Sequence, residues 1–348
     1  MPYKHLFIFV LILSLASACS SGEKASQPAI APAPEITPKL KVDAAILSSK
    51  NYINLPSASG LEKVGNRYFI LSDDSPYLYQ LNEQQKVTKK YALIDTSNFK
   101  DGRIPKAIKP DLESMSQLIY GRDTLLLLLG SGSATTRNGG FLVNVTENYA
   151  VRPLDLTRFY TFLKRVLKIE TDGILNIEGL AIDKTYAYLL QRPFGGRPNV
   201  LFRFNADDFK DLILRDGPIP AVAVYHFDLP ALNGVPSGFS GAFALGDKLF
   251  FTASVENTPD AIQDGEVLGS FVGIIPLRDL PYATNPASPL PVPVAQLKAS
   301  GGTAFKGKAE SLVVTELVKE KKYKVVIVTD DDQGSSEMLE VELYVQKL

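Results

Sequence analysis

Residues 176–192 read NIEGLAIDKTYAYLLQR. In this stretch a carboxylate, a glycine and a leucine lead into two short runs of apolar and aromatic residues separated by a polar turn, which is typical of two antiparallel strands. Triplets of the same kind, with an acid or a serine before a small residue and an apolar one, start at five positions: Ser59, Glu113, Glu178, Ser240 and Glu310. The stretch is therefore one copy of a unit that the chain repeats.

The units recur roughly 50–70 residues apart, and each contains the same parts in the same order. A strand at the triplet is followed by a polar turn, a second strand, a loop, and a third and a fourth strand. A recurring four-stranded unit is the sequence signature of a β-propeller. We therefore expect an all-β fold of five blades. Six blades are the alternative, if the long fourth unit contains an extra one.

The two ends of the repeat predict how the ring of blades closes. The fifth unit ends with LEVELYV (residues 339–345) and is one strand short, whereas KLKVDAAILSS (residues 39–49) is a strand without a unit. Pairing these two segments would leave no open sheet edge. One short helical insertion is expected at residues 156–167, where Phe159 and Leu163 share an apolar face and Asp155 is a candidate N-cap.

The N-terminus resembles a bacterial lipoprotein signal peptide. A basic Lys4 precedes the apolar run LFIFVLILSL (residues 6–15), and ASA (residues 16–18) stands directly before Cys19. The resemblance implies that residues 1–18 are removed and that Cys19 carries a lipid, which would attach the protein to the outer membrane of the cell envelope. A secretory signal with an incidental cysteine is the alternative. Residues 19–39 read as a flexible Pro-, Ala- and Ser-rich tether, and residues 40–348 as the propeller domain.

The composition excludes several classes of chemistry. Because Cys19 is the only cysteine, an intrachain disulfide and thiol catalysis are excluded. His226 is the only histidine after the leader, so a histidine-rich zinc or iron site within one chain is excluded as well. The formal net charge is −1 and basic residues form no run with interleaved aromatic residues, so nucleic acid is not an expected partner. Any metal must be held by oxygen atoms, which favours Ca²⁺ or Mg²⁺.

Three of the repeated triplets begin with a glutamate. Glu113, Glu178 and Glu310 should lie at one height around the propeller axis, where like charges repel and raise one another's pKa. A shared Ca²⁺ would relieve that repulsion, which makes the three glutamates candidate metal ligands. Hydrogen bonds to backbone N–H groups or to arginines are the alternative. The residues that follow each first position are small, as crowding near an axis requires: Gly60, Ser114, Gly179, Gly241 and Ser311.

A second polar set follows the second strand of each unit and should face one mouth of the central channel. Arginines in nearby loops, Arg137 and Arg197, could meet an anionic group there. The candidate ligand-binding residues are Asp73, Asp74, Arg137, Glu178, Arg192, Glu256 and Asp331. Ordinary solvated turns, which Asp, Ser and Gly also favour, are the alternative for this set.

Several of these motifs together resemble a known family. SGLE, KPDLES, LNIEGLA, LLQR, DGEVLGS, KAES and TDDD are similar to the motifs of an uncharacterised bacterial family of exported β-propeller-like lipoproteins and, more distantly, of the phytase-like and SdiA-regulated propellers. The resemblance implies that the following residues occupy recurring positions of that family: Glu113, Glu178, Arg192, Glu256, Asp264, Glu310 and Asp331. Ser240 departs from the pattern, and Glu62 comes late in its unit, so a ring of acids would be incomplete.

Three functions remain open from the sequence. The leading prediction is a lipid-anchored envelope propeller that binds a small ligand at the channel mouth, with or without Ca²⁺; its partner would be an anionic small molecule or an envelope protein. The first alternative is a calcium-dependent hydrolase of phosphate esters or lactones. The second is a structural protein-interaction module. The fold does not decide among them, because propellers host many functions.

Overall fold

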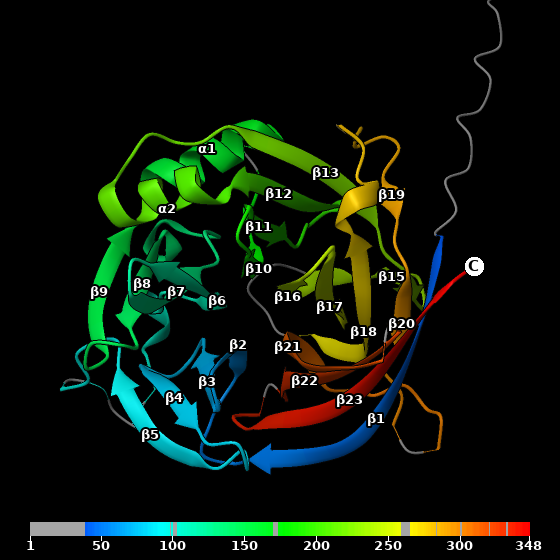
Figure 1. Cartoon of the computed structure of the whole chain (residues 1–348), viewed down its shortest axis with the longest axis horizontal. Coiled ribbons are helices and arrows are strands. Elements are labelled where there is room, and N and C mark those ends of the chain that lie inside the picture. The colour runs from blue at the N-terminus through cyan, green and yellow to red at the C-terminus, as the bar shows by residue number, and fades with distance from the viewer. Residues whose placement is uncertain are drawn as a thin grey trace, which may run out of the picture. The chain divides into compact units, whose positions relative to one another are not determined.

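The computed structural model describes residues 39–97, 99, 103–169, 173–258, 265–282, 284–299, 301–319, 321–331 and 333–348. In this part of the chain, five sheets surround a common axis and form a five-bladed β-propeller, and all their strands pair antiparallel except one short strand added to the third sheet (Figure 1). The predicted leader, Cys19 and nearly all of the tether lie outside the described residues. None of the described helices is long and apolar enough to cross a membrane.

Each blade is named by its strands, from the innermost to the outermost. Blade 1 consists of β2 (Ala58–Val64), β3 (Arg67–Ser72), β4 (Tyr77–Leu81) and β5 (Val87–Ala92). Blade 2 consists of β6 (Leu112–Tyr120), β7 (Asp123–Gly130), β8 (Gly139–Asn144) and β9 (Ala150–Asp155). Blade 3 consists of β10 (Ile177–Ile182), β11 (Tyr186–Gln191), β12 (Asn199–Asn205) and β13 (Val222–Asp228).

The last two blades follow the same plan. Blade 4 consists of β16 (Gly238–Leu245), β17 (Lys248–Asn257), β18 (Glu266–Pro276) and β20 (Val294–Gln296), and it is preceded by the small hairpin of β14 (Ala231–Leu232) and β15 (Val235–Pro236). Blade 5 consists of β21 (Lys308–Lys319), β22 (Lys322–Asp330), β23 (Ser336–Lys347) and, outermost, β1 (Leu40–Tyr52). The alternative of six blades is not observed.

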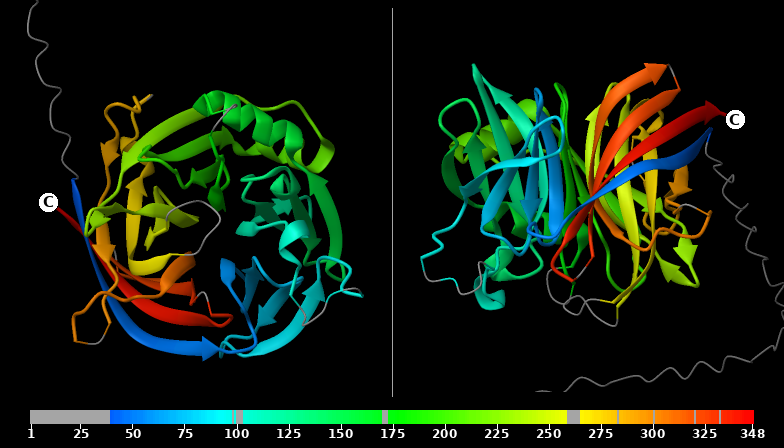
Figure 2. Two further views of the ribbon diagram at one scale, coloured as in Figure 1. Left: turned by 180° about the vertical axis from the view of Figure 1, so that it is seen from behind. Right: turned by 90° about the horizontal axis from the view of Figure 1, so that it is seen from below.

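The ring closes as the sequence predicted. Strand β1 from the start of the domain pairs antiparallel with β23 from its end, from Leu40 opposite Lys347 to Tyr52 opposite Ser336, with one register shift between Ile46 and Ser48. Figure 2 shows the two strands, blue and red, side by side in both views. Because β1 covers the edge of β23, the last blade offers no free strand edge there for another chain to pair with.

The length of the fourth unit comes from a connection that returns to blade 3. After β18 the chain forms β19 (Leu290–Pro291), which pairs in parallel with β13, before β20 completes blade 4. The same connection contacts His226 on β13, whose Nδ1 lies 3.0 Å from the Thr284 hydroxyl. Blade 3 therefore has five strands, and the extra residues tie it to blade 4 instead of forming a sixth blade.

Two α-helices cover the outer side of blades 2 and 3, where the sequence predicted one. The predicted helix, α1 (Thr157–Leu167), begins one residue later than expected, and Asp155 accepts the Thr157 N–H at 2.9 Å although Leu156 is the N-cap. The second, α2 (Ala206–Arg215), was missed in the sequence. It has a better cap than α1, because the Asn205 side chain accepts two backbone N–H groups. The remaining helices are short 3-10 turns: η1 (Lys106–Ile108), η2 (Thr135–Arg137) and η3 (Leu277–Asp279).

Every innermost strand carries a β-bulge at the first residue of its repeated triplet. The pairing with the second strand skips one residue in each blade: Ser59, Glu113, Glu178, Ser240 and Glu310. A bulge leaves one residue out of the ladder and turns its side chain. In two blades that residue is a serine bonded to the neighbouring innermost strand: Ser59 donates to Leu112 O at 2.6 Å and Ser240 to Ala309 O at 2.5 Å. The other three bulges place a glutamate near the axis.

The residue after each bulge is small because another blade is close. A Cβ on Gly241 would lie 2.5 Å from the carbonyl oxygen of Glu310 in blade 5. A Cβ on Gly179 would lie 3.0 Å from the Leu190 Cβ and 3.2 Å from the Ala242 Cβ in blade 4. The repeated triplet is therefore a bulge followed by a close blade-to-blade contact, which confirms that crowding selects its second residue.

Candidate functional site at the channel mouth

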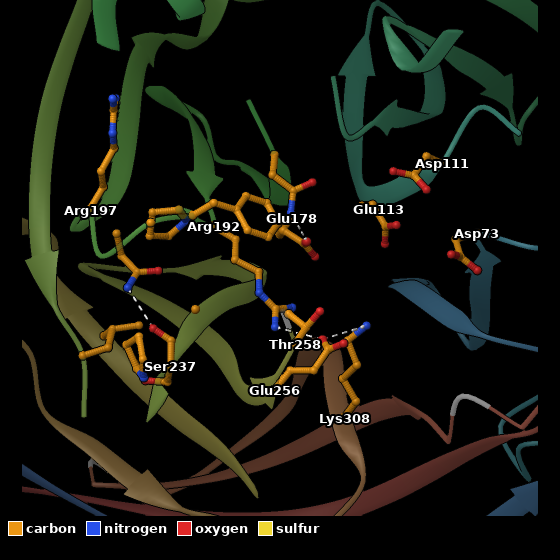
Figure 3. Close-up of a pocket in the computed structure, with 18 of the residues that line it drawn as sticks. Asp73, Asp111, Glu113, Glu178, Arg192, Arg197, Ser237, Glu256, Thr258 and Lys308 are labelled. Atoms are coloured by element: carbon orange, nitrogen blue, oxygen red, sulfur yellow. Dashed lines mark hydrogen bonds and ion pairs between the residues drawn. The ribbon is translucent and has the colours of Figure 1, made fainter. Parts of the chain in front are cut away.

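A pocket of about 700 Å³ lies where the innermost strands begin and the second strands end. All five blades contribute side chains to it, among them Asp73, Glu113, Glu178, Glu256 and Lys308 (Figure 3). The sequence predicted seven residues at one mouth of the channel, and the pocket is lined by six of them: Asp73, Asp74, Arg137, Glu178, Arg192 and Glu256.

The position two residues before each bulge also faces the pocket, and the sequence reading missed it. The residues there are Ser57, Asp111, Asn176, Gly238 and Lys308, and each lines the pocket. The backbone explains the repetition, because the carbonyls of Ser57, Asp111 and Asn176 accept an N–H from the end of the second strand of their blade. The aligned triplets could have predicted these residues, because four of the five residues that stand two positions before a triplet are polar.

An acidic wall comes from blades 1 and 2. Carboxylate oxygens of Asp73, Asp111 and Glu113 lie within 4.8 Å of one another. The Lys109 ammonium contacts the same wall, with Nζ 2.5 Å from Asp73 Oδ2, 2.8 Å from Asp74 Oδ1 and 3.9 Å from Asp111 Oδ1. Lys109 is a further site residue that the sequence did not single out, although it belongs to the KPDLES motif.

The backbone of Asp111 is constrained to hold its side chain in this wall. Its φ of 53° is in the left-handed region, which non-glycine residues seldom adopt. One carboxylate oxygen accepts from the Ser131 hydroxyl at 2.5 Å and from Arg137 Nη1 at 2.8 Å. These two donors secure Asp111 and bring Arg137 to the pocket.

The acids of this wall differ in pKa. Burial, followed by repulsion from Asp111 and Glu178, raises the pKa of Glu113 well above its usual value. Burial also raises the pKa of Asp73 to about 6, although Lys109 opposes the shift. For Asp74, burial is outweighed by the hydrogen bond and charge of Lys109 and by Arg103, so its pKa is lowered.

The opposite side of the mouth is an ion-pair network from blades 3, 4 and 5. Arg192 Nη2 lies 3.2 Å from Glu256 Oε2, and Lys308 Nζ lies 3.7 Å from the same oxygen and 3.1 Å from Glu310 Oε1. Lys308 and Arg192 overcome the effect of burial on Glu256, so its pKa is lowered. Glu178 accepts from Asn176 Nδ2 at 2.5 Å, and its pKa is raised by burial in spite of Arg192 and Lys308.

Glu310 and Asp331 are not placed in the pocket lining. Glu310 is only 3% exposed, and within the described chain its Oε2 is buried without a hydrogen-bond partner. The close group of carboxylates is that of Asp73, Asp111 and Glu113, so Glu178 and Glu310 do not join Glu113 in it. Asp331 is exposed and accepts the Gln333 N–H, whereas its neighbour Asp330 lines the pocket, because successive residues at a strand end face opposite sides. Asp264 lies outside the described residues.

The blade 3 and blade 4 side of the pocket also has an apolar wall. It is formed by the loop after β11, the end of β13, the β14–β15 hairpin and part of the segment before β19: Pro193, Phe194, Phe227, Leu229, Val235, Pro236, Pro286 and Pro289. Arg197, in the same loop as Phe194, is exposed at the rim. The pocket thus offers acids on one side, ion pairs on another, and an apolar surface beside them.

The model of a family of unknown function, DUF6929, matches residues 54–343. The chain belongs to this family. That confirms the expected likeness to an uncharacterised family of propellers, while the lipid anchor and the more distant likeness to the phytase-like propellers stay predictions. No curated protein matches this DUF6929 chain.

Solved structures resemble this DUF6929 protein only in their overall arrangement. The glutaminyl cyclase of Myxococcus xanthus is 13% identical with a TM-score of 0.47, over 89% of this chain and 100% of that one. The arabinanase Arb43A of Bacillus subtilis is 10% identical with a TM-score of 0.43, over 87% of this chain and 97% of that one. Likeness at this level says nothing about what the present chain binds.

Proposed function

We propose that this protein binds a small polar ligand in the channel-mouth pocket and that a lipid on Cys19 holds it at the cell envelope. The observation that carries the proposal is the pocket itself, about 700 Å³ in volume and lined by charged side chains from all five blades. Small-molecule sites typically measure about 300–1,000 Å³ and combine an apolar lining with a few converging polar groups. Ion pairs across the mouth hold the lining in place before a ligand arrives.

The acids favour a binding site over a purely structural channel. No cation lies within ion-pairing distance of the Glu113 carboxyl group in the described residues, and burial together with nearby acids raises its pKa well above the usual value. Keeping such a group costs stability, and natural proteins accept costs of this kind mainly at functional sites. A channel that served packing alone would be expected to have each acid paired.

Thermal unfolding of residues 39–348 in the presence of a small-molecule panel tests the proposal. A ligand at ten times its Kd should stabilise the domain by about 1.4 kcal/mol, which raises Tm by roughly 3 °C in a chain of this size. Glu178→Gln should abolish the shift, whereas Glu83→Gln, an exposed turn residue far from the pocket, should leave it unchanged. Shifts that survive Glu178→Gln would place binding elsewhere and contradict the proposal.

The envelope location has a test of its own. The full-length chain, expressed in a bacterium with a radiolabelled fatty acid, should incorporate label and sediment with outer membranes. Cys19→Ser should do neither. Incorporation of label into the Cys19→Ser variant would overturn the proposed anchor without affecting the pocket.

A calcium-dependent hydrolase of phosphate esters or lactones is the second candidate. It is favoured by the group of Asp73, Asp111 and Glu113, whose oxygens lie within 4.8 Å of one another and are of the type that Ca²⁺ prefers. In that case Ca²⁺, but not Mg²⁺, should raise the Tm of EDTA-treated protein, and Glu113→Gln should remove both that rise and any turnover. An unchanged Tm, with no calcium in elemental analysis of the same sample, would exclude this candidate.

A further inference from the structure

We propose that the ligand is an organic ammonium compound, whose cationic nitrogen enters between Glu113 and Glu178 while its apolar part packs on the wall around Phe194. This inference rests on the proposed ligand-binding function and specifies the chemical class of the ligand. Four observations support it: the ammonium group already seated in the acidic wall, the distribution of paired and unpaired charges, the positive charges beside the acids, and the position of the apolar wall.

The acidic wall already accommodates one ammonium group, that of Lys109. Its Nζ lies within hydrogen-bonding distance of Asp73 and Asp74 and 3.9 Å from Asp111. The Lys109 side chain is only 14% exposed, so its nitrogen is held in the wall and not in solvent. The carboxylates of blades 1 and 2 are therefore spaced as an ammonium ion requires, since its three N–H donors can be shared among neighbouring acids.

Positive charges inside the mouth are already paired, whereas acids remain available. Arg137 pairs with Asp111, Arg192 with Glu256, and Lys308 with Glu256 and Glu310. Within the described residues, no ion pair joins Glu113 to a cation. In the same part of the chain, Glu178 receives a single hydrogen bond, from the neutral Asn176, and Arg192 and Lys308 act on its charge without forming an ion pair with it. The pocket-lining bases without a described ion pair, Lys106 and Arg197, are exposed at the rim. A cation is thus favoured inside the pocket, and an anionic group would meet Glu113 and Glu178 there.

A monovalent organic cation suits this arrangement better than a divalent metal. Lys109 and Arg137 already bring two positive charges against Asp73 and Asp111. A divalent ion at that group would be repelled by both and would have to displace Lys109 from Asp73. An ammonium nitrogen carries half the charge of a divalent ion. It can bind to Glu113 and Glu178, with which Lys109 forms no ion pair within the described residues. The apolar wall on the blade 3 side then accounts for the rest of such a molecule.

Three probes of nearly the same size separate charge from shape: benzylamine, benzyl alcohol and benzoate. With residues 39–348 at pH 7.5, benzylamine at millimolar concentration should raise Tm and bind in calorimetry, and the other two should do neither. Glu113→Gln and Glu178→Gln should each weaken benzylamine binding at least tenfold, while Glu83→Gln should not. Binding should release protons and tighten as the pH rises, because the bound cation favours ionised glutamates.

Loss of binding in a glutamate variant could also come from misfolding, so a variant with the opposite effect is needed. Lys109→Met removes the resident ammonium group, so the charges of Asp73 and Asp74 add to the attraction for a cation bound beside Glu113. It should therefore bind benzylamine several-fold more tightly than the unaltered domain. A misfolded variant cannot gain affinity in this way.

The outcomes distinguish this inference from the function on which it rests. Equal or stronger binding of benzoate or benzyl alcohol, no binding of benzylamine, or weaker binding by Lys109→Met would each overturn the ammonium class. If another compound of the panel binds in a way that needs Glu178, the ligand-binding function stands and only its chemical class changes. If neither the panel nor the probes bind, both proposals fail.

Discussion

Glu113 and Glu178 occupy the same bulge position in neighbouring blades, yet their surroundings differ. Glu113 faces other acids, with Asp111 foremost, whereas Glu178 lies near Arg192 and Lys308. The same bulge position thus holds one carboxyl group whose pKa is raised by burial and by other acids, and another for which cations oppose the effect of burial. A cation between the two would therefore meet carboxyl groups in different electrostatic surroundings.

Glu62 supports a prediction about pH and stability at the scale of one residue. It is 4% exposed, accepts the N–H groups of Lys63 and Gln117, and has a pKa that burial raises to about 7. Because this folded-state pKa exceeds the unfolded value, its contribution to stability is full below about pH 4.5 and is lost as pH rises through 7. Urea unfolding between pH 5 and 8 should show a falling free energy of unfolding, with a shallower slope in Glu62→Gln. An unchanged slope would contradict the assignment.

The sequence identified most single residues of the site but not their partners. Asp73, Arg192 and Glu256 could be predicted because polar residues recur at the ends of the second strands. Lys109 could not, because it precedes the repeated triplet and meets Asp73 only across the gap between two blades. Pairing between blades depends on distances in three dimensions, and the order of residues along one chain does not contain them.

At the scale of single elements, the bulge in each innermost strand explains why a short triplet repeats where the rest of the unit varies. The register of every first strand with its second strand skips the same residue. The sequence indicated small residues near an axis but gave no sign of a bulge. Helix α2 was missed for a different reason: it begins directly after strand β12, in the connection between the third and fourth strands, where the repeated unit predicts no helix.

Glycines after the bulges permit a matched pair of substitutions. A Cβ on Gly241 would approach backbone atoms, 2.5 Å from Glu310 O and 2.7 Å from Ser311 Cα, whereas one on Gly60 would meet the Leu71 Cβ at 3.0 Å. Backbone yields less easily than a side chain, so Gly241→Ala should cost about 3 kcal/mol and Gly60→Ala about 1 kcal/mol or less. Chemical denaturation measures both. Equal costs would show that blade spacing is not set by this contact.

At the scale of the whole propeller, closure joins the two ends of the domain in one blade. The sequence predicted this pairing because the fifth unit was one strand short and the strand at residues 39–49 belonged to no unit. Five blades could be counted from the triplets, whereas the parallel strand β19 that lengthens the fourth unit could not be predicted. A two-residue strand leaves no periodic pattern, and its partner lies more than sixty residues earlier in the chain.

Removing β1 tests closure directly. A chain that begins after Tyr52 would expose the edge of β23 and the apolar surface that Val42 covers, since Val42 is 4% exposed. We expect Tm to fall by roughly 10 °C or more and the protein to self-associate, relative to a control that begins at Lys39. Scanning calorimetry and light scattering report the two effects. Unchanged cooperative unfolding of a monomer would mean that β1 does not close the ring.

The proposed function requires that the ligand binds in the channel-mouth pocket. Peptide-resolved hydrogen–deuterium exchange of residues 39–348, with and without the panel compound or probe that raises Tm most, tests it most directly. Protection should concentrate in peptides containing Asp73, Lys109, Glu113, Glu178 and Arg192, the residues that line the pocket. Protection confined to the outer strands or to the hairpins at the opposite face, or no compound that protects any peptide, would contradict the account.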